Sequence, residues 1–108
     1  MPTHNFDPVS LSIMWDRLVS ITNEIVEALV HTSFSTLDRD NYDLACMLFD
    51  ADGRILAQGT FCQPVFIGTG PHTVRKMLEQ FPAETLEPGD VLFTNDAWIG
   101  TGHLWDVN

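Results

Sequence analysis

The sequence predicts an α+β domain, and three observations support this fold class. A long stretch near the N-terminus repeats apolar residues at helical spacing, two short apolar runs flank a turn in mid-chain, and a second helical stripe precedes a third apolar run. Helix, hairpin, helix and strand in this order indicate an α+β domain. The 108 residues are enough for one small domain, so we expect a single domain over residues 1–108.

The first helix is predicted to begin at Asp7-Pro8 and to end near His31. Aspartate can cap a helix, and proline fits the first helical position, where its missing N–H costs nothing. Apolar residues then recur at helical spacing as Leu11, Trp15, Leu18, Ile25 and Leu29. We therefore expect a long amphipathic helix, with Trp15 as a core or interface aromatic.

A β-hairpin is predicted after the polar, turn-rich residues 33–41. Tyr42–Phe49 is a mostly apolar run, and Arg54–Gln58 is the return strand. Asp50-Ala-Asp-Gly53 supplies the turn, because glycine allows a positive φ and aspartate tolerates it. A calcium loop of EF-hand type needs a glutamate at its twelfth position. Counted from Asp50 that position is Phe61, so we interpret the segment as a turn.

The remaining elements are a second helix and a third strand. Residues 59–70 are predicted to form a loop or irregular strand, and Pro71 to open the helix. The apolar stripe of this helix consists of Val74, Met77, Leu78 and Phe81. After a turn at residues 87–90, Val91–Thr94 is predicted as a strand that leads into a glycine-rich metal-site loop over residues 95–108.

The charge balance argues against two kinds of partner. The chain has 15 acidic and 5 basic side chains and a formal net charge of −10. A nucleic-acid surface needs lysine and arginine against phosphates, and an anionic membrane surface attracts the same positive charges. Clustered carboxylates can also attract a cation, although a solvated acidic surface accounts for most such charges.

Cysteine usage and the N-terminal residues favour a cytoplasmic protein. The cysteines, Cys46 and Cys62, do not make a disulfide framework, and Cys46 lies in an apolar run typical of a reduced core thiol. The first residues have neither the basic nor the apolar region of a signal peptide. No apolar run approaches bilayer-spanning length, so we expect no membrane association.

His103 and Asp106 are the first candidate metal ligands. They lie in a segment loosened by Gly100 and Gly102, after the third predicted strand. Loops held by the end of a rigid strand commonly carry reactive groups, and an imidazole beside a carboxylate suits zinc, manganese or iron(II). The His-x-x-Asp spacing alone is weak evidence, because hydrogen-bonded loop structure is the commoner explanation of such a pair.

Asp43 is a further candidate, at the start of the apolar run that forms the first predicted strand. A buried, isolated carboxylate needs a partner or a metal, whereas an exposed aspartate at a strand end is ordinary surface structure. Neither a Gly-x-Ser-x-Gly nucleophile elbow nor a Gly-x-x-x-x-Gly-Lys phosphate loop occurs in the sequence. No ATP site is therefore visible in this chain.

Several short motifs, in order, resemble one family. They are Asp7-Pro-Val, Asp43-Leu-Ala-Cys-Met-Leu-Phe-Asp, Pro64-Val-Phe-Ile-Gly-Thr, Pro88-Gly-Asp-Val-Leu, Asn95-Asp96 and Gly102-His-Leu-Trp-Asp. Through nearly its whole length the chain resembles the N-terminal part of the hydantoinase B/oxoprolinase family. Several motifs in the order and spacing of the family identify it far more specifically than any single motif does.

The resemblance implies a metal-binding subunit of an ATP-dependent hydrolase of cyclic amides. Carried over residue by residue, the family's ligands fall on Asp43, His103 and Asp106, with Asn95 and Asp96 as residues that orient them. The implied ion is divalent zinc, manganese or iron, while ATP and magnesium would be held by a hydantoinase A-like partner subunit. A further histidine ligand, downstream in the family, has no counterpart before the end of the sequence.

Two other functions stay open at this point. A subunit of an acetone- or acetophenone-type carboxylase would carry the same ligands, and Trp98 and Gly102-His103 resemble that branch. A non-catalytic structural or assembly subunit is the other alternative, since members of the family are several times longer. We accordingly expect a fragment of the larger family fold, or a short subunit related to it, that is inactive in isolation.

Overall fold

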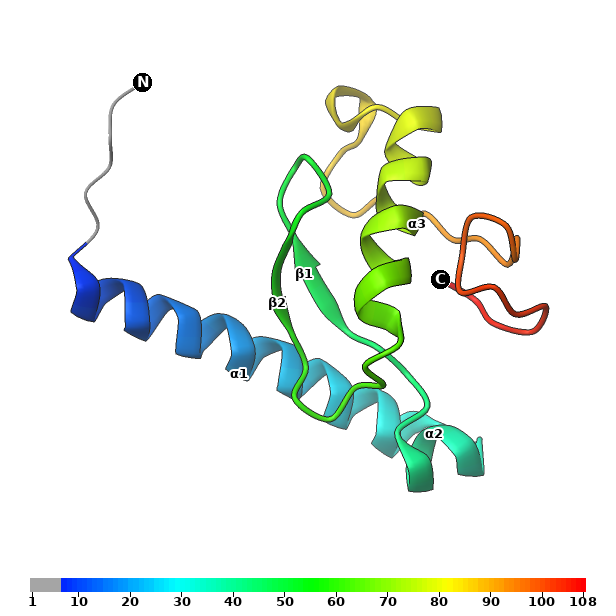
Figure 1. Cartoon of the computed structure of the whole chain (residues 1–108), viewed down its shortest axis with the longest axis horizontal. Helices are drawn as coiled ribbons and strands as arrows, with labels where there is room; N and C mark the ends of the chain where they lie inside the picture. Colours follow the sequence, from blue (N-terminus) through cyan, green and yellow to red (C-terminus); the bar gives the residue numbers. More distant parts are fainter. Residues whose placement is uncertain (1–6) are drawn as a thin grey trace. The chain divides into compact units, whose positions relative to one another are not determined.

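The computed structural model describes residues 7–108 and shows helices together with a two-stranded sheet, which confirms the α+β class. The elements, in order, are α1 (Pro8–Thr32), α2 (Thr36–Asn41), β1 (Met47–Phe49), β2 (Ile55–Gln58), α3 (Phe66–Gln80) and the 3-10 turn η1 (Ala83–Thr85) (Figure 1). None of the helices in residues 7–108 combines the length and the apolar character that crossing a bilayer requires.

The contacts divide the chain into two compact units. The first unit comprises the residues up to Leu48 together with Leu56–Cys62, and it contains α1, α2 and the base of the hairpin. The second unit comprises Phe49–Ile55 and Gln63–Asn108, and it contains the hairpin tip, α3 and the C-terminal segment.

α1 begins and ends where the sequence predicts. The Asp7 carboxylate accepts a hydrogen bond from the backbone N–H of Ser10 at 3.0 Å, and Pro8 occupies the first turn. At the other end, the Ser33 N–H donates to the Leu29 carbonyl at 2.8 Å. Both ends therefore satisfy backbone groups that the helix itself leaves unpaired.

The buried face of α1 is not the stripe that the sequence indicated. Thr22, Val26 and Val30 are buried, with exposed fractions of 0%, 1% and 6%. Most of the predicted stripe is exposed, namely Leu11 (50%), Trp15 (55%), Ile25 (41%) and Leu29 (46%). Apolar residues cover a wide arc of this helix, and periodicity alone does not decide which part of such an arc meets the core.

Gly59 allows the end of the hairpin to approach α1 closely within the first unit. A Cβ at Gly59 would lie 2.6 Å from a methyl carbon of Val26 and 2.9 Å from the Cys62 Sγ. Cys62 Sγ in turn accepts a hydrogen bond from the Cys46 N–H at 3.2 Å. Burial raises the pKa of the Cys46 thiol to about 11, and the neighbouring Cys62 adds to the rise. Cys46 is thus a neutral, reduced core thiol, as its sequence setting predicted.

α2 lies within the stretch that was expected to be a turn region. The Ser35 hydroxyl accepts a hydrogen bond from the Asp38 N–H at 3.4 Å, and the Asp38 carboxylate accepts one from the Ser33 hydroxyl at 3.0 Å. The helix ends at Tyr42, which has a left-handed backbone with a φ of 52°. A serine followed three residues later by an acidic residue resembles a helix cap, and this signal could have predicted α2.

The predicted hairpin is present, with a shorter first strand. β1 starts at Met47 rather than at Tyr42: the left-handed Tyr42 ends α2, and residues 43–46 connect the two elements. The connecting turn follows the prediction, and Gly53 has a φ of 73° that favours glycine. A Cβ at Gly53 would lie 3.0 Å from the Arg75 Cγ, so the hairpin tip packs closely against α3 in the second unit.

α3 begins at Phe66, earlier than the predicted start at Pro71. Pro71 lies inside the helix, and Phe66 is buried, with an exposed fraction of 9%. The Phe66 and Ile67 N–H groups donate to the carbonyls of Gln63 and Pro64 at 3.3 and 3.2 Å, which starts the helix before the proline. The prediction of a loop or strand up to residue 70 was therefore wrong, because proline marks a common helix start but not a necessary one.

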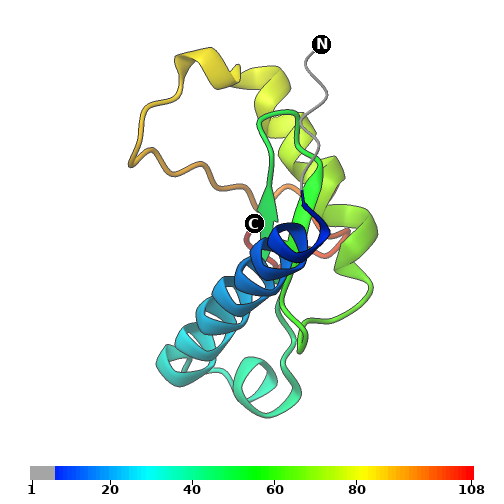
Figure 2. The same ribbon diagram turned by 90° about the vertical axis from the view of Figure 1, so that its left-hand side faces the viewer.

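Residues 91–94 do not form the predicted third strand. The segment that follows α3 is drawn without an arrow in Figure 2. The preceding turn is present, since the Asp90 N–H donates to the Glu87 carbonyl at 3.0 Å. Thr94 and Asn108 exchange backbone hydrogen bonds of 2.8 and 2.9 Å, but this is one pair only. A strand needs a paired neighbour along its length, and within residues 7–108 this run has one only at Thr94.

Candidate metal site

The candidate loop, residues 95–107, is closed at its base by the backbone pair between Thr94 and Asn108. Asp96 shapes its first half through four hydrogen bonds, one of which comes from the Ile99 N–H to its carbonyl at 3.2 Å. The Asp96 N–H donates to the Thr94 hydroxyl at 3.1 Å, its carboxylate accepts from the Trp98 N–H at 2.9 Å, and its carbonyl accepts from the Gly100 N–H at 2.9 Å. Asp96 therefore has a structural task in the loop, and its carboxylate is already engaged by the backbone.

Asp106 is held by a neighbouring hydroxyl. The Thr101 hydroxyl donates to Oδ2 of Asp106 at 2.7 Å, and both residues are half-buried. A short hydrogen bond to a carboxylate oxygen fixes the orientation of that carboxylate. Sequence reasoning missed Thr101, because a hydroxyl five positions upstream of an aspartate matches no known ligand motif.

His103 is exposed and follows Gly102, whose φ is 86°. Within residues 7–108 the His103 imidazole has no hydrogen-bond or ion-pair partner, so it is available to an outside ligand. Its neighbours Leu104 and Trp105 are 78% and 93% exposed. The loop thus presents one imidazole among large apolar side chains.

Asp43 lies in the first unit, between α2 and β1, whereas His103 and Asp106 lie in the second. Its N–H donates to the Leu37 carbonyl at 3.3 Å, and its side chain is exposed. This matches the alternative of an exposed aspartate before a strand. Asn95, predicted to orient the ligands, is exposed on the candidate loop.

The described residues do not assemble a metal centre by themselves. Across residues 7–108, no three histidine, cysteine, aspartate or glutamate side chains are grouped closely enough to hold a metal ion. The donor types of His103 and Asp106 suit a divalent ion of the zinc, manganese or iron(II) kind. The assignment of Asp43, His103 and Asp106 as a ligand set therefore stays a prediction.

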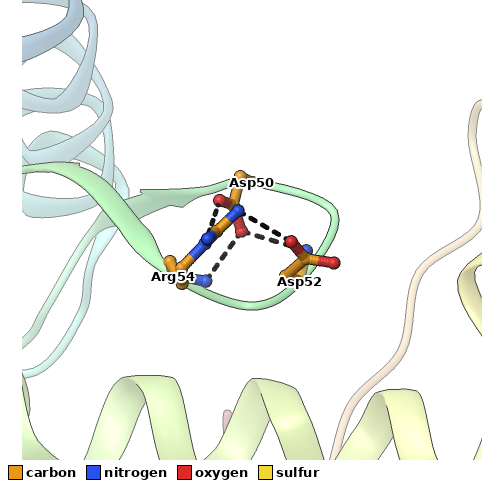
Figure 3. A network of polar contacts seen from close by, with 3 residues as sticks. All are labelled: Asp50, Asp52 and Arg54. Atoms are coloured by element: carbon orange, nitrogen blue, oxygen red, sulfur yellow. Dashed lines mark hydrogen bonds and ion pairs between the residues drawn. The ribbon is translucent and has the colours of Figure 1, made fainter. Parts of the chain in front are cut away.

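The acidic turn of the hairpin is a structural feature rather than a cation site (Figure 3). The Arg54 N–H donates to the Asp50 carboxylate at 2.9 Å, and the Arg54 guanidinium contacts Asp50 and Asp52 at 2.7 Å each. The backbone hydrogen bond from Arg54 and then its guanidinium lower the pKa of Asp50 below the ordinary value. The single Arg54 guanidinium thus bridges both carboxylates within the turn, in agreement with the turn interpretation.

Comparison with known proteins gives the family. The sequence profile of Hydantoinase B/oxoprolinase matches residues 7–108. The 5-oxoprolinase 1 of Arabidopsis thaliana is 38% identical over 101 residues, which are 94% of this chain and 8% of that protein. The 5-oxoprolinase of Saccharomyces cerevisiae is 34% identical over 103 residues, 95% of this chain and 8% of that protein.

A bacterial relative is similar over the same part of the chain. A putative D-/L-hydantoinase subunit from a Pseudomonas species is 26% identical over 103 residues, 94% of this chain and 17% of that protein. No solved structure matches the sequence. The chain therefore spans about 8% of the length of the oxoprolinases that it matches. Since the family profile covers all but the first six residues, the chain belongs to the hydantoinase B/oxoprolinase family.

Proposed function

We propose that this chain is part of an ATP-dependent hydrolase of cyclic amides, of the hydantoinase/oxoprolinase type, and contributes metal ligands to it. The observation that carries the proposal is the candidate loop, where an imidazole without a partner, His103, lies three residues before Asp106, whose carboxylate is oriented by Thr101. Relatives named as a 5-oxoprolinase and as a putative hydantoinase subunit support the reaction class.

In this proposal His103 and Asp106 would hold a divalent ion, zinc, manganese or iron, and Asp43 would be the third ligand that this chain supplies. When bound, such an ion polarises a carbonyl and lowers the pKa of a coordinated water toward neutrality. Thr101 occupies Oδ2 of Asp106, which orients the other carboxylate oxygen for an ion. Asn95 and Asp96 support the loop, and Asp96 does so through its hydrogen bonds to the backbone.

The energy source is proposed to lie on a partner. The sequence has no phosphate-binding Gly-x-x-x-x-Gly-Lys motif, so ATP and magnesium would be bound by a hydantoinase A-like subunit. The remaining ligand, a histidine in the family pattern, would come from further polypeptide of the same assembly. The isolated chain is expected to hydrolyse no lactam.

Metal binding is tested by calorimetric titration of the chain with zinc and with manganese. We expect His103→Ala to weaken binding at least about tenfold, since removal of even a supporting residue commonly costs that much. His72→Ala is the matched control, because His72 is an exposed histidine on α3 outside the loop, and it should leave the affinity unchanged. Equal affinities for the wild type and His103→Ala, or no binding by the wild type, would contradict the proposal.

Variants of Thr101 test whether metal binding depends on the orientation of the Asp106 carboxylate or only on the negative charge of the loop. Thr101→Val removes the donor to Asp106 while keeping the side-chain shape, and we expect weaker metal binding. Thr101→Ser keeps the hydroxyl and should restore most of the affinity. If Thr101→Val binds the ion as tightly as Thr101→Ser, the hydrogen bond does not position a ligand.

A structural or assembly role is the second candidate, and exposed apolar side chains on α1 favour it. Leu11 and Trp15 line a surface pocket together with Pro8 and Ser12, and this pocket has no charged or metal-binding side chain. If this role is right, the chain should assemble with a longer subunit of the family and should itself bind no metal. The titration above therefore separates the two functions.

A further inference from the structure

The backbone pair of Thr94 and Asn108 has the hydrogen bonds of a single step of an antiparallel ladder. The Thr94 N–H donates to the Asn108 carbonyl at 2.8 Å, and the Asn108 N–H donates to the Thr94 carbonyl at 2.9 Å. Two residues that exchange both bonds are a hydrogen-bonded pair of an antiparallel sheet. In such a ladder the next hydrogen-bonded position on the first strand lies two residues away, which here is Leu92.

Val91–Thr94 has the side-chain alternation of a strand. Val91 and Phe93 are 83% and 78% exposed, while Leu92 and Thr94 are half-buried. Among residues 7–108, no hydrogen-bond partner exists for the backbone of Val91, Leu92 or Phe93. Alternating exposure beside unpaired backbone groups is the pattern of an open sheet edge, which accepts a further strand.

We propose that the Val91–Thr94 edge receives an antiparallel strand of the larger hydantoinase B fold, in the register that Asn108 begins. In this register the incoming strand continues the line that Asn108 begins. Its residue two positions beyond Asn108 exchanges hydrogen bonds with the N–H and the carbonyl of Leu92. The relatives support this occupant, because the matched part is only 8% of the oxoprolinases and 17% of the hydantoinase subunit. The matched segment is thus a small part of a much longer polypeptide in those proteins.

A second copy of this chain is a poorer occupant than a strand of the larger fold. The formal net charge of −10 makes two copies repel each other. A copy that pairs along this edge would also have to displace Asn108 or start a ladder at Leu92, since Thr94 already has its partner. The inference does not use His103 or Asp106, so it succeeds or fails independently of the proposed function.

The experiment extends the full chain after Asn108 with the ten residues that follow the matched segment in the Saccharomyces 5-oxoprolinase. The control extension contains the same ten residues in scrambled order. Amide hydrogen exchange at Leu92 is followed by nuclear magnetic resonance in both proteins and in the unextended chain. We expect at least about tenfold slower exchange at Leu92 with the relative's segment, and no change with the scrambled one.

Two proline variants of the extended protein test the register. Leu92→Pro removes a donor on the proposed ladder side and should abolish protection of the amides in the extension. Phe93→Pro removes an N–H that points to the opposite side in this register, so it should leave that protection in place. The proposal would be overturned if both extensions protected Leu92 equally, or if both proline variants had the same effect. It would also be overturned if protection of Leu92 in the unextended chain rose with protein concentration, because a second copy would then be the occupant.

Discussion

Gly59 and Gly100 are both buried glycines, yet their surroundings differ in kind. A Cβ at Gly59 would meet a Val26 methyl at 2.6 Å and the Cys62 sulfur at 2.9 Å, both in the core of the first unit. A Cβ at Gly100 would meet the end of the Asn108 side chain at 2.7 Å and the Asp96 carbonyl at 3.1 Å. The core is stabilised by close packing of apolar atoms. The candidate loop is stabilised by hydrogen bonds and turns, and its close contact at Gly100 is with the flexible end of a side chain.

This difference shows which region is stabilised less by its own packing. Packed apolar atoms resist change in every direction, because the interior has few voids into which they can move. A loop that keeps Leu104, Trp105 and Val107 exposed buries little apolar surface to oppose its conformational entropy. His103 and Asp106, two of the three candidate ligands, therefore lie on a loop that has little packing of its own.

The largest effect is expected for Gly59→Ala. The added methyl group has no room between Val26 and Cys62, and forced overpacking of this kind costs about 3 kcal/mol of unfolding free energy. Urea denaturation measures the loss. Gly68→Ala is the control, since a Cβ there meets nothing within 4 Å and alanine is the better helix former, so stability should rise slightly. Similar stabilities for the two variants would remove the contrast between core and loop.

A smaller effect is expected for Gly100→Ala. The Asn108 side chain can swing away, and the Asp96 carbonyl must shift by only a few tenths of an ångström. We expect a change in unfolding free energy of about 1 kcal/mol or less, together with faster amide exchange at Gly100 and Asn108. A loss as large as that of Gly59→Ala would show that the candidate loop is packed as tightly as the core.

The hairpin turn should make a pH-dependent contribution. The pKa of Asp50 is lowered in the folded chain, so its contribution is present above the pKa of the unfolded chain and is lost as the pH falls through the folded value. Unfolding free energy measured from pH 6 downward to about pH 2 should therefore fall less steeply in Asp50→Asn than in the wild type. Identical pH profiles would assign the lowered pKa no role in stability.

The smallest effect is expected for Trp105→Ala. Trp105 is 93% exposed, and surface substitutions of this kind change stability by no more than about 0.5 kcal/mol. Thermal unfolding of the two proteins should coincide. A large loss on removing Trp105 would instead place this ring in a core and contradict the contrast drawn above.

Local chemistry explains which parts of the fold could be predicted. The ends of α1, the hairpin and the turn at Asp50–Gly53 depend on residues close in sequence, and they were predicted correctly. The buried face of α1 depends on the close approach of Gly59, which no helical pattern contains. The missing third strand has a similar cause, because a strand at Val91–Thr94 requires a distant partner that periodicity does not supply.

The candidate site was predictable only in part, for the same reason. Spacing identified His103 and Asp106 as a weak pair, and the ordered family motifs added Asp43. The hydrogen bond from Thr101 to Asp106 comes from the path of the loop and could not be foreseen. The arrangement of ligands from different parts of the chain is a matter of tertiary structure, which short motifs do not encode.

The exposed apolar half of α1 also affects how unfolding of this chain should be measured. Dyes that fluoresce on apolar surfaces usually report partly unfolded states. Here Leu11, Met14 and Trp15 are 50%, 47% and 55% exposed in the folded chain, so such a dye has a binding surface before any unfolding occurs. Dye fluorescence would therefore be high at the start of a melting curve, and circular dichroism of the helices gives the sounder signal.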